Sequence, residues 1–138
     1  MSTPDTPPTT QDADQPLRIL VVDDNADAAE SLALLLEMHG HQAQTAGDAT
    51  TALDAAGQLT PELIFLDIGL PGIDGYELGR RLRTLPALAA ARIVALSGHG
   101  TADDRRRSRE AGFAAHLQKP IDLGELPAII ARAMATRA

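Results

Sequence analysis

Three short apolar runs constrain the fold of this chain more than any other feature of its sequence. They occupy residues 19–22, 63–66 and 93–96, and each is four residues long without a polar interruption. An uninterrupted run of this length is typical of a strand that is buried on both faces of a parallel sheet. We therefore predict three central strands with helices packed on both sides of them.

Longer segments with apolar residues at helical spacing separate these runs. The clearest covers residues 26–39 and stops at Gly40, the residue type most common just past a helix end. Further helices are predicted at 49–57, 76–85, 102–111 and 123–136, and weaker edge strands at 41–46 and 114–118. The pattern predicts an α/β, doubly wound (βα)5 flavodoxin-like fold, whose parallel five-stranded sheet has the order 2-1-3-4-5.

The composition of the chain disfavours several classes of function. The 138 residues fit one domain, and the net charge of −7 disfavours attraction to nucleic acid or to anionic lipid. There is no cysteine for a disulfide or a thiolate metal site, and no apolar run reaches the roughly 20 residues of a spanning helix. We expect a soluble cytoplasmic protein that has no nucleic-acid or membrane partner.

The first 16 residues differ from the rest of the chain. They are rich in proline and threonine, contain three aspartates and carry almost no apolar side chain. Such a segment cannot bury enough surface to offset the entropy of ordering it. We predict a disordered acidic tail at 1–16 and a single domain at 17–136.

Polar residues follow the predicted strands directly. Asp23 and Asp24 come after the first run, Asp67 after the second, Ser97 after the third, and Lys119 after the last edge strand. In a doubly wound sheet, ligands bind beyond the carboxyl ends of the strands. Three carboxylates gathered there repel one another, and an oxygen-liganded cation such as Mg²⁺ would compensate them. Taken singly, the same residues are also explained as a helix cap, a turn, a strand exit and a solvated charge.

The single lysine of the chain supports the prediction of a ligand site at the strand ends. Lys119 is the only lysine beside eleven arginines, and it falls at one of the strand ends. An ammonium group is a compact charge that can approach one anionic oxygen, whereas a guanidinium spreads over two.

Four motifs follow one another across the chain. They are RILVVDDN at 18–25, LDIGLPGIDGYE at 66–77, ALSG at 95–98 and KP at 119–120. Together they resemble the receiver domain of two-component response regulators, and the resemblance covers about residues 17–133. Four motifs in order at domain-wide spacing make this resemblance specific.

The resemblance implies a role for each matching residue. Asp67 would accept a phosphoryl group from a phosphohistidine of a histidine kinase or histidine phosphotransfer protein. Mg²⁺ would be held by Asp23, Asp24, Asp67 and the backbone carbonyl of Gly69. Lys119 would pair with a phosphoryl oxygen, Ser97 would reorient toward another, and the bond between Lys119 and Pro120 would be cis. Such a phosphoprotein is a signalling phosphoacceptor rather than an enzyme, with slow self-dephosphorylation at most.

Three positions are candidates for a switch or for modulating the lifetime of the phosphoryl group. Receivers with an aromatic switch carry tyrosine or phenylalanine three residues before the lysine, where this chain has His116. A histidine at this position resembles the pattern of receivers attached to hybrid histidine kinases. A partly exposed histidine on an edge strand, with no switch role, explains the residue equally well. Gly69 has no side chain to influence water attack on a phosphoryl group, and His99 could cover the site instead.

Other function classes fit less well. A phosphatase with an aspartyl-phosphate intermediate generally has a second aspartate two residues after the nucleophile, where Gly69 stands here. We expect a stand-alone receiver, monomeric or weakly dimeric, with no DNA-binding output domain. It would act in a phosphorelay through contact with a downstream protein target. The charged run at 103–110 is then either a solvated helix face or part of a docking surface.

Overall fold

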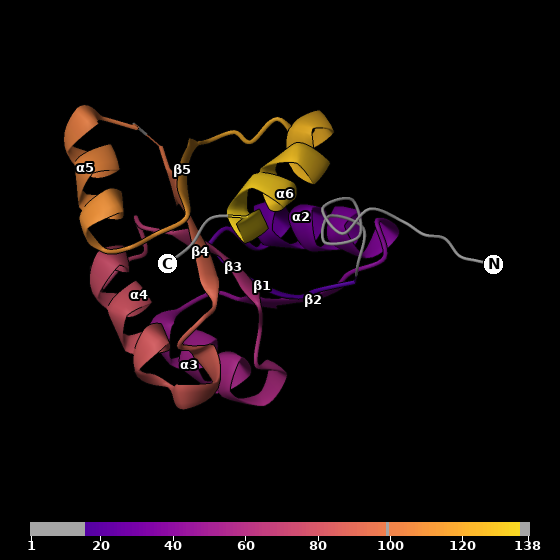
Figure 1. Ribbon diagram of the computed structural model, residues 1–138, viewed down its shortest axis with the longest axis horizontal. Helices are drawn as coiled ribbons and strands as arrows, with labels where there is room; N and C mark the ends of the chain where they lie inside the picture. The colour runs from indigo at the N-terminus through magenta and orange to yellow at the C-terminus, as the bar shows by residue number, and fades with distance from the viewer. Residues whose placement is uncertain (1–15, 99, 136–138) are drawn as a thin grey trace.

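The sheet has the predicted order. The computed structural model describes residues 16–98 and 100–135 (Figure 1). Within these residues five strands form one sheet in the order β2-β1-β3-β4-β5, and all neighbouring strands are parallel. The strands are β1 (Arg18–Val22), β2 (Gln42–Ala46), β3 (Leu63–Asp67), β4 (Arg92–Ser97) and β5 (Ala115–Gln118). The doubly wound α/β fold is confirmed.

Helices cover both faces of this sheet. They are α2 (Ala26–Met38), α3 (Ala49–Leu59), α4 (Gly75–Thr84), α5 (Ala102–Glu110) and α6 (Leu126–Ala135), with 3₁₀ turns η1 (Pro86–Leu88) and η2 (Leu123–Glu125). Figure 1 shows α2 and α6 on one side of the sheet and α3 and α4 on the other, with α5 alongside β5. Among the described residues, no helix combines the length and apolar character needed to cross a bilayer.

The uninterrupted apolar runs serve two separate cores. In β1, Ile19 and Val21 pack with residues of α2 and α6, whereas Leu20 and Val22 pack with residues of α3 and α4. Successive strand side chains point to opposite faces, so a central strand needs apolar residues at every position. The edge strands β2 and β5 are less buried than the central strands, which explains their weaker sequence signal.

The last helix differs from the prediction of one helix over 123–136. The 3₁₀ turn η2 comes first, with the Asp122 side chain accepting a hydrogen bond from the Gly124 N–H, and α6 begins at Leu126. Pro127 has no N–H to donate to the carbonyl of Leu123, so an α-helix cannot run through this point with its full hydrogen bonding. Residue 136 and the predicted tail up to residue 15 lie outside the described residues.

Two glycines in helices predict opposite stability changes. A Cβ at Gly75, the first residue of α4, would lie 2.3 Å from the Cα of Ile68, and this backbone atom cannot move aside cheaply. Gly57 lies inside α3 with no heavy atom within 4 Å of such a Cβ. We expect Gly75→Ala to lower the free energy of unfolding by about 1–3 kcal/mol. Gly57→Ala should raise it by roughly 0.5–1 kcal/mol.

Urea unfolding of the two alanine variants beside the parent chain measures both changes. Equal changes in the free energy of unfolding, in the same direction for both variants, would contradict the close packing of the segment after β3 against α4.

Candidate functional site

The strand register brings the predicted polar residues to one edge of the sheet. Asp67, the last residue of β3, is paired with Leu96, the residue before Ser97. Ser97 in turn is paired with Gln118, the residue before Lys119. The carboxyl ends of β3, β4 and β5 therefore present a carboxylate, a hydroxyl and an ammonium group side by side.

The three aspartates form one cluster. Asp23, Asp24 and Asp67 each offer a carboxylate oxygen, and these oxygens lie within 4.8 Å of one another. Asp23 and Asp67 are only 4% and 6% exposed, whereas Asp24 is exposed. The helix cap that offered an alternative explanation is provided by Asn25, whose side chain accepts from the Ala28 N–H at 3.1 Å. Neither Asp23 nor Asp24 is the capping residue of α2.

Lys119 joins the two buried carboxylates. Its Nζ lies 2.8 Å from Asp23 Oδ2 and 3.1 Å from Asp67 Oδ2. Burial by itself lowers the pKa of Lys119, but its hydrogen bonds to Asp23 and Asp67 and their charges outweigh burial, so the pKa is raised overall. The ammonium group therefore stays protonated, and three carboxylates with one ammonium leave a formal charge of −3 + 1 = −2.

This donor set suits a hard divalent cation. All three side chains offer carboxylate oxygens, the residual charge matches that of one divalent ion, and exposed Asp24 leaves room for water ligands. The N–H of Gly69 donates to Asp67 Oδ1 at 2.8 Å, which fixes the orientation of that carboxylate. A Cβ at Gly69 would lie 3.4 Å from the same oxygen, so the glycine keeps this side of the carboxylate open.

An apolar cavity opens beside the cluster. It has a volume of about 430 Å³ and lies between α2 and the segment that follows β5. Asp23 and Lys119 line its polar end, and Leu32, Leu96 and Ile121 line its apolar part. The bond between Lys119 and Pro120, at the rim of this cavity, is cis, as the resemblance implied.

Ser97 and His116 are in direct contact. The Ser97 hydroxyl oxygen lies 2.8 Å from His116 Nε2 and accepts a hydrogen bond from the Gly100 N–H at 3.0 Å. The other ring nitrogen, Nδ1, lies 2.7 Å from the hydroxyl oxygen of Ser108 on α5. His116 is only partly exposed, and both of its nitrogens have hydrogen-bond partners. His99, also a candidate in the sequence, lies outside the described residues.

Ser108 was not predicted from the sequence. It is 2% exposed and lies on the side of α5 that faces β5. The available signal was its position as the only uncharged residue in the charged run at 103–110.

Two arginines of that run, Arg106 and Arg107, make contacts within the protein. Arg106 pairs with Asp103 and Glu110 on its own helix. Arg107 reaches α4, where its guanidinium lies 2.7 Å from Asp74 Oδ2 and 4.2 Å from the centre of the Tyr76 ring. Arg107 therefore links α5 to α4. The sequence had suggested a solvated helix face or a docking surface, and neither includes this contact.

Comparison with known proteins gives one consistent result. Residues 19–131 match the model of the response regulator receiver domain. An uncharacterized 14.6 kDa protein of Leptolyngbya boryana is 36% identical over 108 residues, which cover 78% of this chain and 82% of that protein. The response regulator Rre1 of Synechocystis is 34% identical over 122 residues, 88% of this chain and 53% of Rre1.

A solved structure adds a chemical detail about a similar protein. A response regulator protein from Burkholderia pseudomallei, determined with a phosphorylated aspartic acid, calcium ion and citrate, superimposes with a TM-score of 0.75. It is 29% identical, and the match covers 82% of this chain and 65% of that one. Among the curated relatives compared, the chain spans from 14% to 82% of the other protein's length.

Proposed function

The chain belongs to the response regulator receiver family of two-component systems, and from this premise we propose that Asp67 accepts a phosphoryl group in a Mg²⁺-dependent reaction. The observation that carries the proposal is the arrangement around Asp67. This buried carboxylate has an ammonium group at 3.1 Å and two further carboxylates whose oxygens lie within 4.8 Å. Phosphoryl transfer requires just this combination of an aligned nucleophile and compensated charge.

The donor class that fits is a phosphohistidine of a histidine kinase or histidine phosphotransfer protein. In the transfer, the N–P bond of the donor breaks and its electron pair stays on the imidazole nitrogen. A new P–O bond forms to a carboxylate oxygen of Asp67. The apolar cavity between α2 and the segment after β5 lies next to this carboxylate cluster and gives a partner's side chain a surface to approach along.

The other side chains of the site would bind the metal ion and contact the phosphoryl oxygens. Asp23, Asp24, Asp67 and the Gly69 carbonyl would hold Mg²⁺, which supplies positive charge to the phosphoryl oxygens when bound. Lys119 can move from the Asp67 carboxylate to a phosphoryl oxygen without leaving the site, since its Nζ is already 3.1 Å from Asp67 Oδ2. The Ser97 hydroxyl, at the neighbouring strand end, would bond a second phosphoryl oxygen.

The product is a signal rather than a released molecule. A phosphoryl group carries about −1.5 to −2 charges but replaces the −1 of the Asp67 carboxylate, so the site gains roughly −0.5 to −1. The charge also moves outward onto the phosphoryl oxygens, a local change that can bias a two-state element. The phosphorylated aspartic acid in the Burkholderia regulator supports the same modification here. Gly69 provides no side chain to donate a proton, so hydrolysis of the acyl phosphate should be slow. The output would be contact with a downstream protein.

Incubation with acetyl phosphate tests this function. In the presence of Mg²⁺, intact-mass spectrometry should show the addition of one phosphoryl group per chain, and peptide mapping should place it on Asp67. Excess EDTA should prevent the addition. No addition with Mg²⁺, or a phosphoryl group on another residue, would contradict the proposal.

Asp24→Asn should separate metal binding from stability. Asp24 is exposed, so removing its charge leaves the core intact while one metal ligand is weakened. We expect the affinity for Mg²⁺ to fall by roughly tenfold or more, which corresponds to about 1.4 kcal/mol. Without metal, the variant should be at least as stable as the parent, because repulsion between carboxylates is relieved.

Calorimetric titration with Mg²⁺ and thermal unfolding in EDTA check the two parts of this expectation. Asp27→Asn is the matched control, because Asp27 is an exposed aspartate in the first turn of α2. Equal Mg²⁺ affinity in the two variants would remove Asp24 from the site.

A further inference from the structure

The strand β2 forms a free edge of the sheet. It is the last strand in the order β2-β1-β3-β4-β5, and among the described residues no further strand pairs with it. Figure 1 shows β2 at the end of the sheet, next to α2. A free edge leaves backbone N–H and C=O groups without partners, so another extended chain can add to the sheet there.

The strand register shows which backbone groups of β2 are free. The Gln42 N–H donates to the carbonyl of Leu17 at 2.9 Å, and the register of β2 with β1 continues without a break to the end of the strand. Residues 42, 44 and 46 therefore turn their backbone groups toward β1. Because backbone groups alternate in direction along a strand, those of Ala43 and Thr45 point away from the sheet.

The sequence of β2 does not block the addition of another strand. Its five residues, QAQTA, include no charged residue and no proline. The pairing with β1 is in register over all five residues, without a bulge. Soluble proteins commonly protect a free edge with charged side chains, with proline or with a bulge, and β2 has none of these protections.

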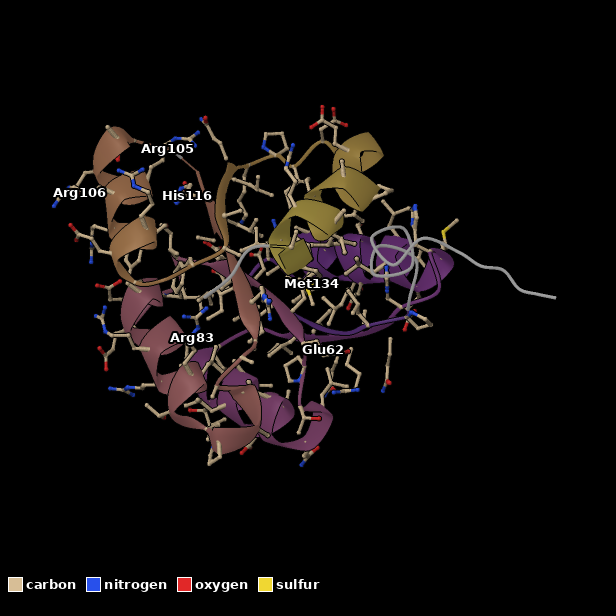
Figure 2. All side chains as sticks on the ribbon, viewed as in Figure 1. Glu62, Arg83, Arg105, Arg106, His116 and Met134 are labelled. Atoms are coloured by element: carbon tan, nitrogen blue, oxygen red, sulfur yellow. The ribbon has the colours of Figure 1, made fainter. Side chains whose placement is uncertain are left out.

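The helices that flank this edge carry only acidic charges. No lysine or arginine occurs between Arg18 and Arg80, a stretch that includes the whole of α2, β2 and α3. The arginines labelled in Figure 2, Arg83, Arg105 and Arg106, lie on the α4 and α5 side of the molecule. The β2 edge therefore lies in the acidic half of a protein whose charges are unevenly distributed.

Three exposed carboxylates border β2. Glu30 and Glu37 are exposed and lie two helical turns apart, so they share one side of α2. The opposite side of α2 contributes Ser31 and Leu32 to the cavity beside the aspartate cluster, which places the two glutamates on the side toward the β2 edge. Asp48, the exposed capping residue of α3, follows the carboxyl end of β2 by two residues.

We propose that the free edge of β2 binds an extended basic segment of a partner protein as a sixth strand. The outward N–H and C=O groups of Ala43 and Thr45 would bond the backbone of this segment. The Ala43 side chain packs in the core on the α2 face of the sheet. Alternate side chains of an added strand lie on that same face, so lysines or arginines at these positions would meet Glu30 and Glu37.

Charge decides between this occupant and a second copy of the chain. Two copies joined through β2 would bring two acidic surfaces together, whereas a basic segment neutralises the one acidic surface. The proposed site uses neither Asp67 nor a metal ion, so it stands or falls independently of the phosphoacceptor function.

Amide hydrogen exchange with a synthetic peptide tests the proposal. The probe is a peptide of about eight residues in which lysine and valine alternate, a typical strand length. At saturating peptide the exchange of the Ala43 and Thr45 N–H groups should slow by roughly tenfold or more, because both become hydrogen-bonded. The N–H groups of Gln42 and Gln44 face β1 and should change less.

Two results of this experiment would overturn the proposal. One is saturating peptide that leaves the exchange of the Ala43 and Thr45 N–H groups unchanged. The other is slowed exchange of the same groups without peptide when the protein concentration is raised, which would assign the edge to a second copy of the chain.

Thr45→Pro tests the backbone contact. The substitution removes an outward N–H group, and proline is tolerated on an edge strand at such a position. We expect urea unfolding close to that of the parent and an affinity for the lysine–valine peptide that falls by roughly tenfold or more. Thr45→Val keeps the N–H group and is the matched control, with the affinity of the parent. Equal affinity of the two variants would contradict strand addition.

The double variant Glu30→Gln, Glu37→Gln tests the charge. We expect the affinity for the lysine–valine peptide to fall by roughly fivefold or more at low salt, and less at high salt, where the charges are screened. The double variant Asp27→Asn, Asp54→Asn is the matched control, because it removes the same charge from other exposed positions of α2 and α3. Equal losses in the two double variants would show only a general attraction between opposite charges and would overturn the proposed site.

Discussion

Asp67→Asn should abolish phosphoryl uptake from acetyl phosphate while leaving the protein folded. The amide has nearly the shape of the carboxylate, and its single oxygen can keep the hydrogen bond from the Gly69 N–H. The bond from Lys119 to Asp67 Oδ2 is then lost, but Lys119 stays paired with Asp23. The amide is, however, a much weaker nucleophile and removes one ligand charge from the metal cluster. We expect no phosphoryl group at position 67 under conditions in which the parent chain is fully modified.

The stability of this variant distinguishes a lost nucleophile from a lost fold. The substitution removes one of three mutually repelling carboxylates, so thermal unfolding in EDTA should show no destabilisation beyond about 1 kcal/mol. Asp54→Asn, at an exposed aspartate of α3, is the matched control and should be phosphorylated as the parent is. Uptake by Asp67→Asn equal to that of this control would refute the assignment of Asp67.

Lys119→Met should destabilise the metal-free protein and make its stability depend on Mg²⁺. The substitution leaves the buried carboxylates of Asp23 and Asp67 without the ammonium group that lies within 3.1 Å of both. Breaking a buried ion pair typically costs about 3–5 kcal/mol. Because the Lys119 side chain is 29% exposed, we expect a smaller loss of about 1–3 kcal/mol.

Urea unfolding with EDTA and with Mg²⁺ measures this loss and its recovery. The divalent ion should stabilise Lys119→Met more than it stabilises the parent chain, because the variant lacks the competing positive charge. Lys119→Arg retains the charge and should be less destabilised in EDTA than Lys119→Met. A Lys119→Met protein that is as stable as the parent in EDTA would show that the ion pair contributes nothing.

The central sheet was predictable because burial on both faces leaves a distinct pattern in the sequence. Every residue of 19–22 faces one of two cores, so no polar residue interrupts the run. The last helix was less predictable. Its start depends on two features that act together, the 3₁₀ turn capped by Asp122 and the missing N–H of Pro127, and helical spacing reveals neither.

The carboxylate cluster was also predictable, since parallel strands end at the same edge, Asp23 and Lys119 directly follow a strand, and Asp67 ends one. The link from His116 to Ser108 was not. It depends on how α5 is rotated against β5, and a serine within a charged run is usually exposed. The engagement of Arg107 with Asp74 depends on the same packing of α5 against α4.

Transfer from a phosphohistidine donor tests the central claim most directly. The measurement is the intact mass of both proteins after this chain is mixed with a phosphorylated histidine phosphotransfer protein and Mg²⁺, followed by peptide mapping. We predict that the donor loses its phosphoryl group as this chain gains one on Asp67, and that EDTA blocks the exchange. A phosphoryl group that appears on another residue, or equally well in EDTA, would contradict the account.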